Sequence, residues 1–158
     1  MQHNYWPKNK FRGSEMAQDR NFGPSRYVCY KLNKVMRKIQ RYYEHGLSPY
    51  GITPVQFYVL SALWENDGVK FKDLARSLHM DGSTLTGILD RMERLDLVER
   101  RDDPEDRRSL LIFLKEKARR YRRELVELAD KLDREIREQF LPEEFSTFER
   151  ILDRLSQD

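Results

Sequence analysis

The fold of this chain is decided by residues 71–114, which read FKDLARSLHMDGSTLTGILDRMERLDLVERRDDPEDRRSLLIFL. Apolar residues recur there at the spacing of two short helices: Leu74, Ala75 and Leu78 in the first, and Leu85, Leu89, Met92 and Leu95 in the second. Two β-compatible runs follow, residues 98–101 and 109–114, joined by a turn rich in Asp and Arg. This order predicts a winged helix-turn-helix, within a mostly α fold that carries only a small β wing (α+β).

The second of these helices has the features of a helix that enters the major groove of double-stranded DNA. Asp81 and Ser83 favour a helix start. The helical period leaves Ser83, Thr84 and Arg91 opposite the apolar stripe. Short hydroxyl side chains can bond a phosphate or a base edge without holding the helix away from the groove. The alternative interpretation is that Ser83, Thr84 and Thr86 cap the helix and do nothing more.

Every residue of the turn between the two β-compatible runs is charged except Pro104, so we expect the turn to project into solvent. Arg108, at the far end of the turn, is suited to a narrow minor groove, where the negative potential is enhanced. Asp106, two residues earlier, is expected to hold the Arg108 guanidinium as an ion pair. The alternative is an ordinary surface salt bridge, which contributes roughly 0–1 kcal/mol to stability.

Residues 81–114 resemble the MarR family of bacterial winged-helix transcription regulators, both in the recognition helix and in the Asp-x-Arg wing. The resemblance extends more loosely over about residues 26–155, because the family places helices on both sides of the winged domain to make a dimer. One departure from the family lies at the junction after the wing. The family usually has a Thr there, followed a few residues later by a Gly, whereas this chain has Lys115, and residues 115–118 look continuous with the last helices. The resemblance implies a DNA-binding set with three roles. DNA is contacted by Ser83, Thr84, Thr86 and Arg91, Arg108 is inserted into the minor groove and steadied by Asp106, and Arg107 contacts a phosphate.

Amphipathic patterns also precede the winged segment. Between Pro24 and about His45 one stripe is formed by Val28, Leu32, Val35, Ile39 and Tyr42. We expect Gly46 to end this helix. Thr53 as N-cap and Pro54 in the first turn predict the start of the next helix, whose inward side chains are Phe57, Leu60, Leu63 and Trp64.

Two more stripes follow the wing and predict a homodimer. The longer one is formed by Ala118, Tyr121, Leu125, Leu128, Leu132, Ile136 and Phe140, and the final one by Phe145, Phe148, Leu152 and Leu155. These apolar stripes would be buried against the same stripes of a second chain. Such a dimer has two recognition helices, as the paired half-sites of a two-fold operator require. The alternative is that the stripes form a core within one chain. The expected organisation is a flexible arm (1–23), a first dimerisation helix (24–47), the winged helix-turn-helix domain (48–114) and C-terminal dimerisation helices (115–158).

Composition limits the remaining possibilities. The 158 residues carry 30 Lys and Arg against 27 Asp and Glu, a net charge of +3 that does not by itself indicate nucleic acid. The placement of the charged residues along the chain is more informative, because the segment 107–123 contains eight basic residues and one acidic residue. The single cysteine excludes an internal disulfide, and no apolar run approaches the roughly 18 residues that a membrane span requires. We expect a cytoplasmic protein with no membrane partner.

Cys29 lies in YVCYKLNKV, residues 27–35, which resembles the OhrR hydroperoxide-sensing branch of the MarR family. In that branch a cysteine at this point is oxidised and the protein leaves DNA, and Tyr43 matches a tyrosine that hydrogen-bonds the cysteine. Fourteen residues of helix span about 21 Å, so Cys29 and Tyr43 would meet only across a dimer. Two further thiolate-binding tyrosines of that branch are replaced here by Asn33 and Pro54. Cys29 is therefore either a sensor of organic hydroperoxide or a structural thiol.

A small aromatic ligand is the other candidate trigger, because MarR relatives often bind phenolic compounds between the dimer helices and the winged domain. The residues that could line such a cleft are Tyr30, Tyr42, Tyr43, Phe57 and Trp64. Aromatic residues at helical spacing are also typical of an ordinary core.

The sequence favours a non-enzymatic protein without metal or cofactor. It has no Gly-rich phosphate loop, no His-Glu-x-x-His and no nucleophile elbow, and His3, His45 and His79 are widely separated. We expect a DNA-binding transcriptional regulator, a repressor released from its operator by a small molecule. The alternatives are a peroxide sensor using Cys29 and a winged-helix protein-interaction module that reads no bases.

Overall fold

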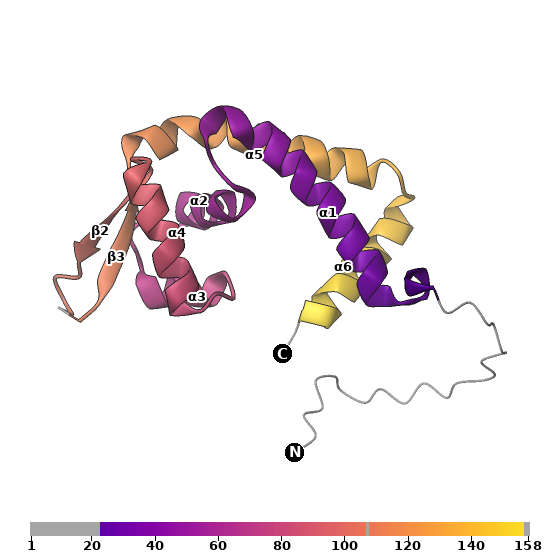
Figure 1. Cartoon of the computed structure of the whole chain (residues 1–158), viewed down its shortest axis with the longest axis horizontal. Coiled ribbons are helices and arrows are strands. Elements are labelled where there is room, and N and C mark those ends of the chain that lie inside the picture. The colour runs from indigo at the N-terminus through magenta and orange to yellow at the C-terminus, as the bar shows by residue number, and fades with distance from the viewer. Residues whose placement is uncertain (1–22, 107, 157–158) are drawn as a thin grey trace, which may run out of the picture. The chain divides into compact units, whose positions relative to one another are not determined.

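The computed structural model describes residues 23–106 and 108–156 (Figure 1). The predicted N-terminal arm, apart from Gly23, and the predicted phosphate contact Arg107 lie outside the described residues. Contacts divide the chain into two compact units, one ending at Met36 and one of residues 37–158, and each is described by itself. In the first unit the described residues form the turn η1 (Pro24–Arg26) and the first part of helix α1 (Val28–Leu47).

Helix α1 ends one residue beyond Gly46, so the prediction that Gly46 stops it is wrong. A Cβ added to Gly46 would lie 2.6 Å from both terminal methyl carbons of Leu128, so the glycine allows a close approach of helix α5 (Glu116–Arg137). The chain turns further on, through η2 (Ser48–Tyr50) and Gly51, which has a φ of 66°. Glycine adopts this left-handed conformation without steric cost.

Helix α2 (Pro54–Glu65) begins as the sequence predicts. The Thr53 hydroxyl accepts from the Gln56 backbone N–H at 3.4 Å, and the Gln56 side-chain oxygen accepts from the Thr53 N–H at 2.9 Å. This reciprocal pair satisfies two backbone donors that the helix itself leaves free. Phe57, Leu60 and Leu63 are buried, as expected.

The predicted wing belongs to a three-stranded antiparallel sheet with the order β1-β3-β2. Its strands are β1 (Val69–Lys70), β2 (Val98–Asp102) and β3 (Leu110–Leu114), so Ser109 falls outside the strand expected to contain it. The two longer strands, β2 and β3, are labelled in Figure 1. In the central strand, Ile112 pairs with Val69 on one side and with Arg100 on the other. Ile112 is fully buried and joins the sheet to the helices.

Helices α3 (Phe71–Ser77) and α4 (Gly82–Arg94) pack on this sheet together with α2. The turn between them passes through His79 in the left-handed region, with a φ of 50°, a conformation that His tolerates better than most residues. Helix α4 buries Leu85, Leu89 and Met92 as predicted and also Ile88, which the sequence reasoning left out. These side chains form one core with α2 and the sheet.

The C-terminal part consists of α5 and α6 (Pro142–Ser156). Lys115 is the N-cap of α5 and has an extended backbone, and its N–H donates to the Leu97 carbonyl at 2.9 Å. Helix α5 ends at Arg137, and Phe140 therefore lies in the turn and does not extend the helical stripe. Phe145 is the buried residue of α6, whereas its other apolar residues are exposed: Phe148, Ile151, Leu152 and Leu155. Among the described residues, no helix has the length and apolar character that a membrane span requires.

Candidate nucleic-acid interface

The N-terminal turn of α4 is organised by Asp81, which is its N-cap. The Asp81 carboxylate accepts three hydrogen bonds: from the Thr84 backbone N–H at 2.8 Å, the Ser83 hydroxyl at 2.5 Å and the Thr84 hydroxyl at 2.6 Å. The Ser83 hydroxyl and then the Thr84 hydroxyl and N–H hold the Asp81 pKa far below its usual range. Asp81 therefore carries a negative charge at neutral pH.

The predicted contact residues of α4 share one exposed face. Ser83, Thr84, Thr86 and Arg91 are all exposed, opposite the buried stripe of the helix. The Thr86 hydroxyl donates to the Gly82 carbonyl at 2.8 Å. The cap itself is Asp81, whereas the Ser83, Thr84 and Thr86 hydroxyls act as donors within this turn and accept none of the free backbone N–H groups among the bonds of the described residues.

Arg100, on β2, ties the wing to α4. Its guanidinium donates to Glu93 at 2.6 Å and to the Thr86 carbonyl at 3.1 Å, and it lies 2.8 Å from Asp90. The Arg100 backbone N–H also donates to Glu93, at 3.1 Å. Sequence reasoning missed this residue, although Asp90 and Glu93 at a spacing of three indicate a shared acidic helix face that a neighbouring cation would occupy.

The tip of the wing is built differently from the prediction. Asp106 accepts the backbone N–H of Arg108 at 3.0 Å, and among the described residues it forms no ion pair with the Arg108 guanidinium. An Asp side chain commonly bonds the backbone two residues on, since this closes a turn at little cost in side-chain entropy. Asp106 thus shapes the backbone and leaves the exposed Arg108 side chain free to extend.

Asp103 anchors the base of this turn. Its carboxylate is buried, accepts the Glu105 backbone N–H at 2.9 Å and pairs with Lys70 of β1, whose Nζ lies 2.9 Å away. The Glu105 N–H, followed by the Lys70 ammonium, keeps the Asp103 pKa below its ordinary value. The loop is therefore fixed at its root by a charged pair that spans the sheet.

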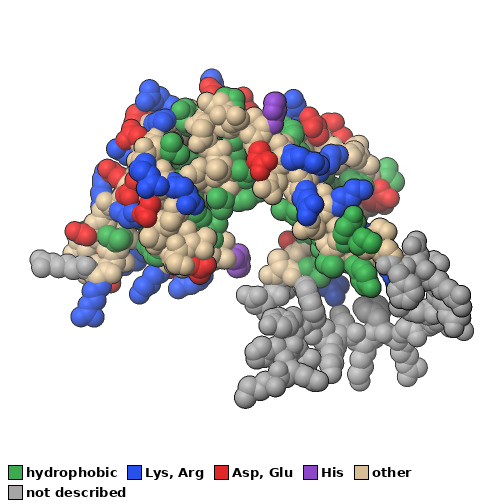
Figure 2. All heavy atoms as spheres, in the orientation of Figure 1, with side chains coloured by type: hydrophobic (Ala, Val, Ile, Leu, Met, Phe, Trp, Pro, Cys, Tyr) green, Lys and Arg blue, Asp and Glu red, His purple; other side chains and the backbone are tan. Residues whose placement is uncertain are grey.

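Basic side chains are exposed on both α3 and α4. They include Lys72, Arg76 and Arg94, and Figure 2 shows Lys and Arg interspersed with Asp and Glu over the winged segment. Such a distribution suits a polyanion better than the small net charge of the whole chain suggests.

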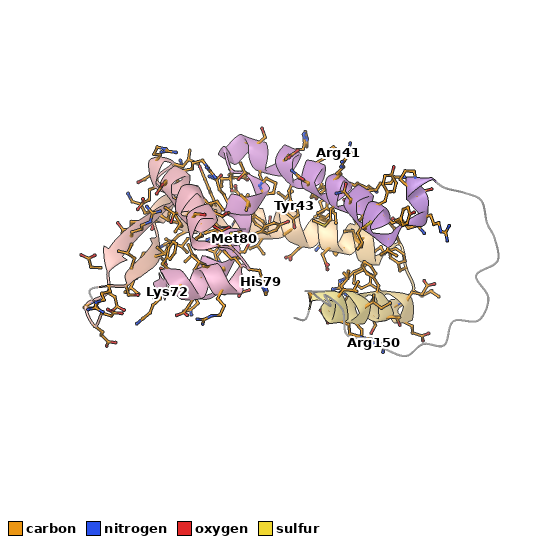
Figure 3. The ribbon with its side chains drawn as sticks, turned by 60° about the horizontal axis from the view of Figure 1, so that its bottom comes forward. Arg41, Tyr43, Lys72, His79, Met80 and Arg150 are labelled. Atoms are coloured by element: carbon orange, nitrogen blue, oxygen red, sulfur yellow. The ribbon has the colours of Figure 1, made fainter. Side chains whose placement is uncertain are left out.

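The aromatic residues predicted to line a ligand cleft lie mainly in the core. Phe57 and Trp64 are buried, and the Trp64 indole N–H donates to the Ala118 carbonyl at 3.2 Å. Tyr42 donates to the Leu128 carbonyl at 3.4 Å, while Tyr30 is exposed in the first unit. A pocket of about 420 Å³ lies elsewhere, against α2 and the segment after α3 that includes His79 and Met80 in Figure 3. Its lining residues are Tyr58, Ser61, Ala62, Glu65, Ser77, Leu78 and Met80.

The two residues of the predicted redox site have different surroundings. Cys29 is the second residue of α1 and is exposed. Tyr43, labelled in Figure 3, stacks on Phe57 with ring centroids 5.3 Å apart, and burial raises the pKa of its phenol. The hydroperoxide-sensor hypothesis stays a prediction.

Known proteins share this arrangement. Residues 52–110 match the model of the MarR family. The chain is 34% identical over 106 residues to the HTH-type transcriptional regulator MgrA of Staphylococcus aureus, covering 66% of this chain and 72% of MgrA. The chain belongs to the MarR family. It is also 35% identical over 112 residues to the HTH-type transcriptional regulator YsmB of Bacillus subtilis, covering 71% and 77% of the two chains.

The solved structure of reduced AbfR bound to DNA has the same fold. It is 27% identical to this chain, with a TM-score of 0.68, and the match covers 83% of this chain and 90% of AbfR. The predicted family and winged-helix fold are therefore confirmed. As a MarR-family member this chain is a transcriptional regulator and not an enzyme.

Proposed function

We propose that this chain acts in the cytoplasm as a homodimeric repressor that binds a pseudo-palindromic operator and is released by a small molecule. The observation that carries the proposal is the exposed polar face of α4, held beside the wing by Arg100. We infer that Ser83, Thr84, Thr86 and Arg91 contact the major groove, whereas Arg108 enters the adjacent minor groove. Arg107 is retained as a phosphate contact on the resemblance alone.

The exposed apolar face of α6 supports the homodimer. Phe148, Ile151, Leu152 and Leu155 recur at spacings of three and four residues and are all exposed in the single chain. A second copy with the same face would bury these side chains symmetrically and would set two recognition helices on one duplex. The segments 24–47 and 115–158 are accordingly proposed as the dimerisation segments.

DNA recognition is tested by footprinting the full chain on the duplex upstream of its own coding region and then titrating the protected duplex by fluorescence anisotropy. Affinity should fall linearly on a log–log plot against salt concentration, because basic residues displace counterions from DNA. Arg91→Ala and Arg108→Ala should each weaken binding about 5-fold or more, whereas Lys131→Ala on α5 should not. Unchanged affinity in both arginine variants would contradict the assigned contacts, whereas the absence of any protected duplex would favour a protein-interaction module.

The pocket between α2 and the α3–α4 segment supports release by a small aromatic compound. Leu78 and Met80 line it and lie within four residues of the start of α4, so a bound ligand would bias the position of the recognition helix. Hydroxybenzoates should lower the affinity of the wild-type protein for its duplex. Ser61→Trp, which fills the pocket, should bind DNA but lose this response, and the control Ser146→Trp on α6 should keep it. An unaltered response in Ser61→Trp would exclude the pocket.

The exposed position of Cys29 supports the alternative trigger, oxidation by an organic hydroperoxide. The wild-type protein and Cys29→Ser, each bound to the duplex, are treated with cumene hydroperoxide. Release of the wild type together with retention of the variant supports redox sensing. Identical behaviour of the two proteins eliminates it.

A further inference from the structure

The hydroxyl groups of α4 have a fixed hydrogen-bond polarity. A serine or threonine hydroxyl has one proton to donate and two lone pairs that accept. Ser83 and Thr84 both direct that proton at the Asp81 carboxylate, at 2.5 and 2.6 Å, and Thr86 directs its proton at the Gly82 carbonyl at 2.8 Å. Because an ionised carboxylate only accepts, the direction of the Ser83 and Thr84 bonds is not interchangeable.

What remains outward on these side chains is acceptor capacity. All three residues are exposed, and because each hydroxyl has already donated its proton, only its lone pairs are left for a partner outside the chain. A phosphate oxygen also only accepts, and the Asp81 charge beside Ser83 and Thr84 repels it. These hydroxyls are therefore poor phosphate contacts, and the arginines and backbone N–H groups of the segment suit that role better.

In the major groove, hydrogen-bond donors are few. Adenine offers its N6 amino group and cytosine its N4 amino group, whereas guanine and thymine offer only acceptors there. We propose that Asp81 is a specificity-determining residue, which fixes Ser83 and Thr84 as acceptors and so selects an amino base, adenine or cytosine, over a keto base, guanine or thymine, on the contacted strand. The proposal rests on the proposed DNA-reading function and adds to it the chemical class of base that is read.

The first test removes the amino groups from DNA. A duplex selected by the wild-type protein from a randomised pool is resynthesised with single adenines replaced by purine, and single cytosines by 2-pyrimidinone, each lacking the exocyclic amine. Losing a neutral hydrogen bond should weaken wild-type binding about 3- to 10-fold at one or two positions in each half-site. Ser83→Ala or Thr84→Val should abolish the extra loss at the matching position.

The second test reverses the polarity without removing the cap. Asn is as good an N-cap as Asp, so Asp81→Asn should leave the melting temperature nearly unchanged. Its amide NH₂ donates where one carboxylate oxygen accepted, so one hydroxyl turns its proton outward. Selection from the same pool should then show an adenine-or-cytosine preference at least about threefold weaker at one position, with guanine or thymine gaining. A purely structural role for Asp81 would lower affinity for all sequences alike.

The outcomes distinguish a failure of the base preference from a failure of the proposed DNA recognition. If no duplex binds at low salt, the proposed DNA recognition is wrong and the inference falls with it. If a duplex binds with steep salt dependence, yet every amine deletion is tolerated, only the inference is overturned. Identical base preferences of the wild type and Asp81→Asn would also overturn it.

Discussion

Helices α4 and α6 are both amphipathic, yet the apolar face of α4 is buried within the chain and most of the apolar face of α6 is exposed. In α4, Leu85, Leu89 and Met92 are 0% exposed, whereas in α6 Phe148 is 41% and Ile151 47% exposed. The core around α4 is completed by α2 and the sheet of the same chain. Amphipathic spacing thus predicts that a helix face is buried against other residues. Only the structure shows whether those residues belong to the same chain.

The sharpest test of this contrast truncates one residue in the core. Leu89→Ala should lower the free energy of unfolding by about 2–5 kcal/mol, because it removes transfer energy and leaves a cavity that its neighbours fill only partly. Urea denaturation measures the loss. Leu110→Ala, at the exposed start of β3 in the same winged segment, is the matched control and should lower the free energy of unfolding by about 1 kcal/mol or less. Equal losses would contradict the contrast.

The corresponding change in α6 should act on assembly. Ile151→Asp sets a charge in the exposed apolar face and should raise the dimer dissociation constant about 30-fold or more, since the proposed interface would bury that charge without a partner. Sedimentation across a dilution series gives the constant. Ser146→Asp adds the same charge on the opposite side of α6 and should change it little. If both variants stay dimeric, the α6 face is not the interface.

Arg100 in the winged segment and Arg137 in the C-terminal part each join two elements through ion pairs, so their effects on DNA binding can be compared. Arg100 joins β2 to α4 through Glu93, and Arg137 joins α5 to α6, pairing with Asp133 and Glu149 at 2.6 Å each. Arg100→Met should weaken binding to the selected duplex about 10-fold, because the wing loses its fixed position and two carboxylates near the DNA lose their cation. Arg137→Met should leave the affinity within about twofold at a protein concentration that keeps it dimeric. Equal effects would show that Arg100 does not position the wing.

The smallest expected effect concerns pH and the root of the wing. The folded-state pKa of Asp103 lies below the unfolded value of about 3.9, so its charged form stabilises the folded state. That contribution is complete above about pH 4 and is lost as the pH falls through the folded-state pKa. The difference in unfolding free energy between the wild type and Asp103→Asn should therefore shrink between pH 6 and pH 3 in urea titrations. A constant difference would exclude the charged pair as its source.

Features that depend on neighbouring residues in the chain were predictable from the sequence. Thr53 and Asp81 act as N-caps because a short polar side chain bonds N–H groups only two or three residues away. The wing followed from two β-compatible runs around a turn. The exposed face of α4 followed from helical period alone.

Features that depend on distant contacts were not predictable. Gly46 looked like a helix stop, but its role depends on Leu128, far along the chain. The expected ion pair between Asp106 and Arg108 does not form among the described residues, because the Asp106 carboxylate accepts the Arg108 backbone N–H instead. Arg100 was missed because both of its carboxylate partners lie on another element, and Phe57 was assigned to a cleft because an aromatic stripe looks the same in a core.

The hydrogen bond from Trp64 of α2 to the Ala118 carbonyl of α5 has a practical consequence. The sequence holds two tryptophans, so in a Trp6→Phe variant all indole fluorescence comes from Trp64. Separation of α2 from α5 would expose this indole to water and move its emission to longer wavelength. The chain thus carries its own optical signal at the junction between the DNA-reading segment and the long C-terminal helix, and movement there on binding DNA or a small molecule can be followed in real time without a label.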